Sequence, residues 1–386
     1  MACTTSSAAI SPSSIAVEAD CEPPSSVCSL ADGIRAANAS GEAVVITLGP
    51  QSVHTLETVD HRSEGGNGLP AVTGELRIEG QGARVERSPT SDTPVFRLFR
   101  VAPEGKLTLR DLTLTHGATE RGFDGAAIWN LGELRLDRVV IEDNHSGDDG
   151  GGIRNDGVLV IEDSVIRNNS ARWRGGVGGG LQNAEQFGPA ELKVERSSFI
   201  GNEAWASGGG LWLEGTSRLR NTTVSGNRAG ERGAGIHNYG ELELRNCTVT
   251  ENRAHVTGGG LFTFGSVVIG NTILSGNEAM ISGECKGILQ STGHNLLGKL
   301  FECTVAGLSE GNLLNTPPLL ESLSGDGAPP GHRPRAESPA LGAGSGEPFS
   351  SADAACSERD QHGVKRPAGR CDIGAVQRRS AEEAGR

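Results

Sequence analysis

The stretch NRAGERGAGI at residues 227–236 returns 25 residues later as NRAHVTGGGL at residues 252–261. Each copy opens with an asparagine, has an alanine two positions later, and closes with a glycine-rich run and a branched aliphatic residue. Insertions at 173–177 and 184–190 explain the single spacing of 33 among spacings of 25. The asparagines that share this phase are Asn144, Asn169, Asn202, Asn227, Asn252 and Asn277.

Two pairs of mostly apolar residues precede each asparagine, and the members of a pair stand two positions apart. Leu159/Ile161 and Leu242/Leu244 are examples. Such alternation is typical of β-strands with one face inward, and no helical period occurs in the unit. We therefore predict three short strands per unit. One unit cannot bury its inward face alone, so stacked units must share one core, as in a parallel β-helix.

The phased asparagines are predicted to be structural. Coils of a parallel β-helix lie about 4.8 Å apart, close enough for side-chain amides to bond to the coils above and below. We therefore interpret the six residues as a ladder in a turn and do not expect them to bind a ligand. The glycine runs supply positive φ or room for close backbone approach at a corner.

Composition and charge exclude several classes of protein. The chain has 386 residues, 57 of them glycine, and a formal net charge of −13. Nucleic acid and anionic membranes are disfavoured as partners because both need a basic face. No run of 18 apolar residues occurs, so we expect no transmembrane segment. We expect a monomer.

Six of the eight cysteines fall in pairs outside the repeat, in irregular segments where cross-links stabilise most. We predict three disulfides and an oxidising compartment. The pairs are Cys21 with Cys28, Cys285 with Cys303, and Cys356 with Cys371. Cys247 shares an inward phase with Thr222 and Thr272, so we expect a buried free thiol there.

The first residues, Met1-Ala2-Cys3 before a Ser/Thr-rich run, resemble the end of a bacterial lipoprotein signal. Two interpretations stay open: a lipid on Cys3 that attaches an outer-membrane lipoprotein, or an ordinary start.

Two motifs resemble those of bacterial surface proteins. Residues 28–38, CSLADGIRAAN, are similar to the CSLREA-type N-terminal region, although Ala31-Asp32-Gly33 replaces Arg-Glu-Ala. The run GHNL at 293–296 and the run RPAGRCDIGA at 366–375 are similar to the choice-of-anchor Q region; Gln377 stands where that pattern usually has Glu. The resemblance implies a bacterial protein that is extracellular or at the cell surface.

We divide the chain by these patterns. A short helix with Leu30, Ile34 and Ala37 on one face is predicted near the start. The predicted parts are a flexible tether (1–14), an N-terminal cap with irregular first coils (15–105), regular coils (106–280), an irregular disulfide-bonded C-terminal cap (281–378) and a tail (379–386).

Right-handed β-helices of this kind resemble the pectin-lyase superfamily, so an enzyme must be considered. A lyase of that type needs carboxylates on one outward face to hold calcium, with an arginine or lysine as base. Asp137, Glu162 and Glu195 share one outward phase, and Arg220 and Arg245 continue it. We favour the interpretation that these side chains form a solvent-exposed column in which neighbouring charges pair with one another. We identify no convincing catalytic constellation and no cofactor, calcium being the weak alternative.

Glycan binding is the other hypothesis. The four tryptophans, Trp129, Trp173, Trp205 and Trp212, all fall near loops or the glycine corner. Insertions map to one rim of a solenoid, often the binding rim. We therefore name Trp173 as the first contact residue, with Phe187 in the second insertion.

We predict a secreted or cell-surface right-handed parallel β-helix with a structural, adhesive or glycan-binding role. The alternative is a polysaccharide lyase or glycoside hydrolase. His294 and His362 are expected to fix turns through hydrogen bonds.

Overall fold

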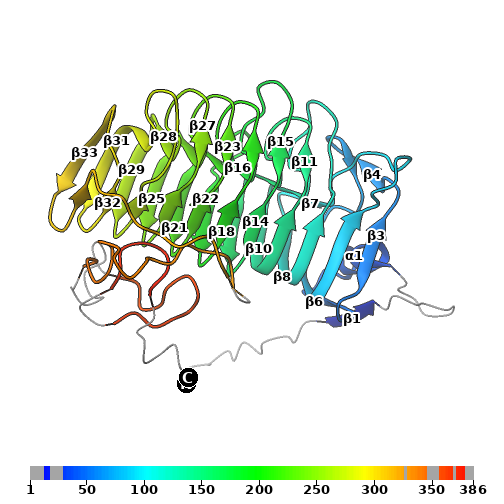
Figure 1. The fold of residues 1–386 in the computed structure, drawn as a ribbon. Coiled ribbons are helices and arrows are strands. Elements are labelled where there is room, and N and C mark those ends of the chain that lie inside the picture. The colour runs from blue at the N-terminus through cyan, green and yellow to red at the C-terminus, as the bar shows by residue number, and fades with distance from the viewer. Residues whose placement is uncertain (1–12, 18–28, 326–327, 346–355, 368–370, 379–386) are drawn as a thin grey trace, which may run out of the picture.

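The computed structural model describes residues 13–17, 29–325, 328–345, 356–367 and 371–378. Nearly all of its strands pair in parallel with the equivalent strand one coil away, and the coils stack into a rod (Figure 1). The fold is the predicted parallel β-helix.

Each coil has three faces. The coil of β13 (Val158–Glu162) shows the pattern, continuing through β14 (Val165–Arg167), β15 (Ser170–Ala171) and β16 (Leu181–Asn183). Face 1 contains the strands equivalent to β13 and β14, face 2 those equivalent to β15, and face 3 those equivalent to β16. The two-residue strand of face 2 was not predicted, because two residues are too few to show alternation.

The first segments of face 1 are β2 (Val44–Leu48), β6 (Glu75–Arg87), β8 (Lys106–Thr115), β10 (Glu133–Glu142), β13, β17 (Glu191–Glu195), β21 (Thr216–Arg220), β25 (Glu241–Arg245), β29 (Ser266–Gly270), β31 (Cys285–Thr292) and β33 (Cys303–Leu308); β6, β8 and β10 also run through the second segment. The second segments are β3 (Val53–Leu56), β14, β18 (Ser198–Ile200), β22 (Thr223–Ser225), β26 (Thr248–Thr250), β30 (Ile273–Leu274), β32 (Leu296–Leu297) and β34 (Leu313–Leu314).

Face 2 consists of β11 (His145–Ser146), β15, β19 (Glu203–Ala204), β23 (Arg228–Ala229) and β27 (Arg253–Ala254). Face 3 consists of β7 (Phe99–Val101), β9 (Ile128–Asn130), β12 (Ile153–Asn155), β16, β20 (Leu211–Leu213), β24 (Ile236–Asn238), β28 (Leu261–Thr263) and the first residues of β31, which pair with β28. β1 (Ser13–Val17) pairs in parallel with β2 and extends face 1 at its N-terminal edge. The antiparallel pair β4 (His61–Arg62) and β5 (Gly66–Asn67) lies outside the faces.

The core is one continuous column of apolar side chains. Leu159 stands in register with Leu134 on one side and Leu192 on the other, and all three are buried. Val158, the preceding residue, points outward and is 39% exposed. The alternation read from the sequence therefore separates core from surface as predicted.

Glycines at the corner before face 3 have two distinct roles. The first of each run adopts positive φ, as Gly208 does at 66°. The third lies against the next coil: a Cβ on Gly210 would lie 2.6 Å from the carbonyl oxygen of Gly235. Both positions favour glycine, the first because of backbone conformation and the second because of space.

The asparagine ladder is present along the rod. The Nδ2 of Asn202 donates to Oδ1 of Asn227 at 3.0 Å, and that same oxygen accepts from the backbone N–H of Asn202. The last rung, Asn277, donates from Nδ2 to a carboxylate oxygen of Glu284 at 2.9 Å. Glu284 is 8% exposed, and burial raises its pKa. The ladder is thus a one-way chain of amides that ends at a buried carboxylate.

Helix α1 (Leu30–Ser40) covers the N-terminal end of the rod. Ser29 caps it by accepting from the N–H of Asp32, and Leu30, Ile34 and Ala37 are its buried face, as predicted. Cys3 and the predicted pair Cys21 and Cys28 lie outside the described residues.

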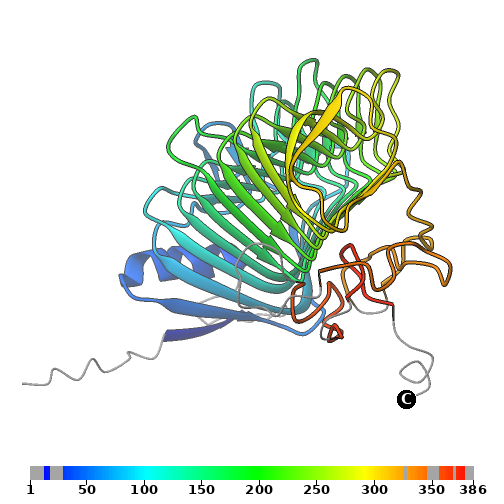
Figure 2. The same ribbon diagram turned by 90° about the vertical axis from the view of Figure 1, so that its left-hand side faces the viewer.

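The C-terminal region does more than follow the last coil. Its described residues from Pro318 to Gln377 fold back along the second segments of face 1 (Figures 1 and 2). Gln361 Nε2 donates to Ser198 Oγ at 2.7 Å, and His332 Nε2 lies 2.8 Å from Ser225 Oγ. Disulfides join Cys285 to Cys303 and Cys356 to Cys371.

Candidate functional site

The acidic column lies on face 1 and is in register. Asp137 stands beside Glu162, and Glu162 beside Glu195. Asp137 accepts hydrogen bonds from Arg110 and Arg138, each at 2.7 Å, and Glu162 accepts from Arg135 at 2.6 Å. Glu195 accepts from Asn221 at 2.8 Å.

These carboxylates therefore pair with donors of their own face and do not converge on a common point. In the part of the chain that the structure describes, no group of three or more His, Cys, Asp or Glu side chains is arranged to hold a metal ion.

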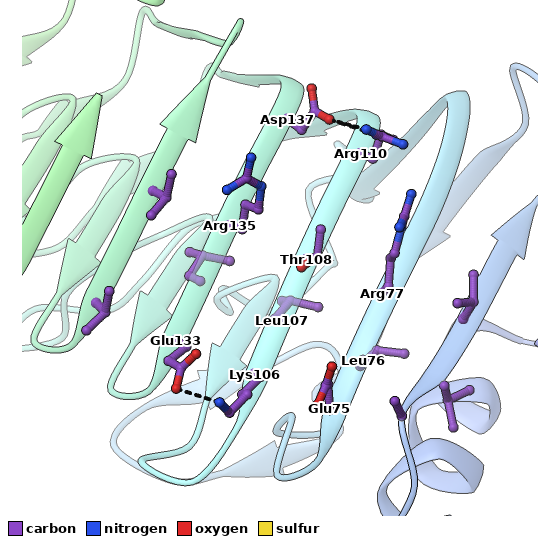
Figure 3. A pocket seen from close by; sticks show the side chains of 16 residues that line it. Glu75, Leu76, Arg77, Lys106, Leu107, Thr108, Arg110, Glu133, Arg135 and Asp137 are labelled. Atoms are coloured by element: carbon purple, nitrogen blue, oxygen red, sulfur yellow. Dashed lines mark hydrogen bonds and ion pairs between the residues drawn. The ribbon is translucent and has the colours of Figure 1, made fainter. Parts of the chain in front are cut away.

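A shallow groove of about 660 Å³ crosses β2, β6, β8, β10 and β13 on this face (Figure 3). Arg77, Lys106, Arg110 and Arg135 line it. Each basic side chain has a carboxylate partner: Arg77 pairs with Glu79, Lys106 with Glu133 at 2.7 Å, Arg110 with Asp137 at 2.7 Å and Arg135 with Glu162 at 2.6 Å. An anionic ligand in this groove would have to compete with all four.

The two insertions lie beside face 3, one before β16 and one after it. Trp173 of the first is 46% exposed, with the Arg121 guanidinium 4.9 Å from its ring centre. Phe187 of the second is 54% exposed, and its ring centre lies 5.9 Å from that of Trp129. Trp129 is therefore covered and only 4% exposed, whereas Trp173 is open to solvent.

Between the insertions lies a buried ionic network centred on Arg154, the outward residue of β12. Its guanidinium donates to Asp156 at 2.7 Å and also pairs with Asp124 and Gln186. Arg154 is 4% exposed. Buried charges of this kind are tolerated only when they are paired and fully hydrogen-bonded.

Asp149 adjoins this network. It accepts hydrogen bonds from the N–H of Val177, in the first insertion, at 2.9 Å and from Gln182 Nε2 at 3.1 Å. Burial raises its pKa to about 7, and the nearby carboxylates of Asp124 and Asp148 act in the same direction. Gln182 is 5% exposed, and its Oε1 has no partner among the described residues. A carboxyl with such a pKa could exchange a proton near neutral pH.

Towards the C-terminal end, face 3 becomes aromatic. The residues of this aromatic strip are Trp212, His237, Tyr239, Phe262 and Phe264. The Trp212 and His237 ring centres are 4.4 Å apart, and those of Tyr239 and Phe264 are 5.4 Å apart. Tyr239 is 44% and Phe264 65% exposed.

His237 lies beneath the exposed rings of the strip. It is 2% exposed, and neither ring nitrogen has a partner in the described chain. Burial lowers its pKa to about 3, so it is neutral at physiological pH. Trp205, before β20, is 44% exposed with Arg174 6.0 Å from its ring centre.

The contact residues predicted from sequence do not include the aromatic strip. The prediction named Trp173 and Phe187 because they lie in insertions, and it named Trp212 only as a tryptophan. It missed Tyr239, Phe262 and Phe264, although 212, 237 and 262, and likewise 239 and 264, are spaced by 25. That spacing was the available signal.

Three other residues named from the sequence have local contacts. His294 Nδ1 lies 3.0 Å from the carbonyl oxygen of Ala343, and His362 Nε2 lies 3.2 Å from the carbonyl oxygen of Pro329. The Cys247 thiol is buried and free, and burial raises its pKa to about 12. These contacts provide structural roles for the three side chains.

Among the described residues, no helix is both long and apolar enough to span a membrane. A family model described as a right-handed β-helix region matches residues 100–297, just over half of the chain. No curated protein matches the chain.

Proposed function

Because the chain belongs to the right-handed β-helix family, we propose that it binds a linear glycan along face 3, as a structural or adhesive protein that is secreted or attached to a cell surface. The observation that carries this proposal is the aromatic strip, in which Tyr239 and Phe264 remain open to solvent. The family alone implies the fold and no ligand.

The strip suits a repeating ligand because it repeats itself. Equivalent rings recur on successive coils, about 4.8 Å apart, so a polymer lying along the rod meets similar surroundings at each step. Aromatic side chains supply a large apolar surface to the C–H face of a sugar ring. Trp173 and Trp205 are also exposed, and they lie in the corners that precede β16 and β20 of face 3.

The polar half of face 3 supplies specificity. Binding sites combine apolar surface with a few fixed polar groups. Gln182, whose Oε1 has no partner within the described chain, lies between the insertions near the Arg154 network. Because this acceptor is buried, it would accept from a sugar hydroxyl only after the side chain turns outward.

The disulfides are compatible with an extracellular location. Attachment through a lipid on Cys3, and the relationship to CSLREA-type and choice-of-anchor Q proteins, stay part of the proposal.

Direct binding tests the proposal. Purified protein would be applied to a glycan array, and hits would be measured by titration calorimetry. Replacing both Tyr239 and Phe264 by alanine should weaken binding, whereas Arg77→Ala in the groove of face 1 should leave it unchanged. If the wild type binds no glycan, or if only Arg77→Ala weakens binding, the proposal is wrong.

A second candidate is a glycoside hydrolase or polysaccharide lyase, favoured specifically by the raised pKa of Asp149 beside Asp124. Incubating bound glycans with the protein and assaying reducing ends or unsaturated products separates it from binding alone. Turnover that Asp149→Asn abolishes, with binding retained, would establish the enzyme.

A further inference from the structure

The two ends of the rod are finished differently. Figure 1 shows α1 at one end and β33 at the other. Helix α1 buries Leu30, Ile34 and Ala37 against the first coils. At the C-terminal end, within the described chain, β33 pairs only with β31 and β34 only with β32. One edge of each last strand is therefore left without a strand partner.

Side chains at this end are more exposed than their phase predicts. Val305 stands in register with Leu289, which is fully buried, yet Val305 is only partly buried. Leu314 stands in register with Leu297, which is fully buried, yet Leu314 is 46% exposed. Phe301 and Leu308, at the two ends of β33, are 58% and 60% exposed. Proteins usually protect such an edge with charges, proline or a covering element, because an open edge recruits another strand.

Charges at the two ends of β33 are opposite in sign. Lys286, Lys299 and Glu302 lie before or beside its start, for a net charge of +1, and Glu310 follows its end. An antiparallel partner with the same sequence would place the negative end of one strand near the positive end of the other. The edge is therefore complementary to itself.

We propose that a second copy of this chain docks on the open end, with the two β33 strands antiparallel about a twofold axis at Val305. In that register Val305 faces its own copy, Thr304 faces Ala306 and Cys303 faces Gly307. Side chains directly opposite in an antiparallel pair point to the same side of the sheet. The inward residues of both copies therefore lie on the core side, and the two cores become continuous.

The same register also gives partners to the exposed apolar and charged side chains near β33. Glu302 faces Leu308, so the aliphatic part of Glu302 in each copy covers the exposed Leu308 side chain of the other. Glu310 faces Leu300, adjacent to Lys299. A twofold contact uses the edge completely and closes. Head-to-tail stacking would instead need the other end, where, among the described strands, β1 also pairs only with β2 but α1 packs against the first coils. A dimer replaces the monomer expected from the sequence, and this inference does not depend on glycan binding.

The mass in solution tests the proposal. The full chain, of 40.0 kDa, should give twice that mass by light scattering and dissociate on dilution. Glu310→Lys and Lys299→Glu each replace an attraction by a repulsion at two symmetric positions, so each should weaken dimerisation by roughly tenfold or more. The double exchange should restore it.

Controls keep the result specific. Glu104→Lys carries the same charge change at an exposed position in the loop before β8 and should leave the dimer intact. Circular dichroism and thermal melting would establish that each variant is folded. A wild type that is monomeric throughout, one that grows into filaments, or folded single variants that the double exchange fails to rescue would each overturn the proposal.

Discussion

Faces 1 and 3 are built by one repeat, yet their outward residues differ in chemistry. On face 1, long charged side chains from neighbouring coils pair across the surface, as Arg135 does with Glu162. On face 3, charges such as Arg154 are buried, and neighbouring coils present aromatic rings. The exposed ion pairs of face 1 satisfy one another without a ligand, whereas the exposed aromatic rings of face 3 contact only solvent. The repeat therefore determines the fold, whereas the residues that point outward determine which face is available for binding.

The largest expected effect comes from the Arg154 network. Arg154→Met would leave the carboxylates of Asp124 and Asp156 without their cation, and breaking a buried ion pair costs about 3–5 kcal/mol. Urea unfolding followed by circular dichroism would measure the loss. A loss no larger than that of an exposed arginine would contradict the distinction between the two faces.

The second effect concerns binding. Removing both Tyr239 and Phe264 deletes two exposed rings, each contributing about 1 kcal/mol to contact with a ligand. Together these correspond to roughly a thirtyfold rise in Kd for the bound glycan. Calorimetric titration would measure it, with Trp173→Ala as the test of the residue named from sequence. An unchanged Kd for the double variant would remove the strip from the site.

The third effect depends on pH. Because the folded state raises the pKa of Asp149 to about 7, the folded protein holds that proton more tightly than the unfolded chain does. The stabilisation that the bound proton of Asp149 provides is thus complete at pH values below the ordinary carboxyl pKa. It is lost as the pH rises through about 7.

Asp149→Asn cannot ionise, so its stability relative to the wild type should rise between pH 5 and pH 8. Thermal melting of both proteins across that range would test this. A constant difference in melting temperature would show that Asp149 has an ordinary pKa.

The smallest effect is expected on face 1. Arg135→Gln removes an exposed partner of Glu162, and such pairs contribute about 0–1 kcal/mol. The stability difference from wild type should shrink further in high salt, because exposed charges are screened. Urea unfolding at low and high salt would measure both, as the matched comparison for Arg154→Met.

Much of the fold could be predicted because each coil repeats the same physical problem. Leu159 and Ile161 alternate with outward residues, and the period of 25 sets the register. The position of the C-terminal region could not be predicted, because Gln361 and His332 bond to Ser198 and Ser225 across more than 100 residues of sequence. Small polar residues on a strand do not reveal what will cover them.

The site was predicted only in part. Trp173 was identified because its insertion interrupts the 25-residue period. The column of Asp137, Glu162 and Glu195 was identified because these residues recur at that period. The Arg154 network brings together residues from one strand, two loops and an insertion, so no phase comparison within the repeat could reveal it. The ion pairs of the acidic column involve arginines such as Arg110, which donates to Asp137. Arg110 lies in a coil before the first asparagine of the ladder, so the comparison of repeats did not include it.

The asparagine ladder also affects how readily coils can be added to the rod or removed from it. Each rung is satisfied by the next through the same two bonds, and only Asn277 requires a different acceptor, Glu284. Whole units of 25 residues could therefore be duplicated or deleted between the ends without new chemistry at the joint. Such a change would lengthen or shorten face 3 by whole coils, so gene duplication could adjust the length of this surface while both ends stay the same.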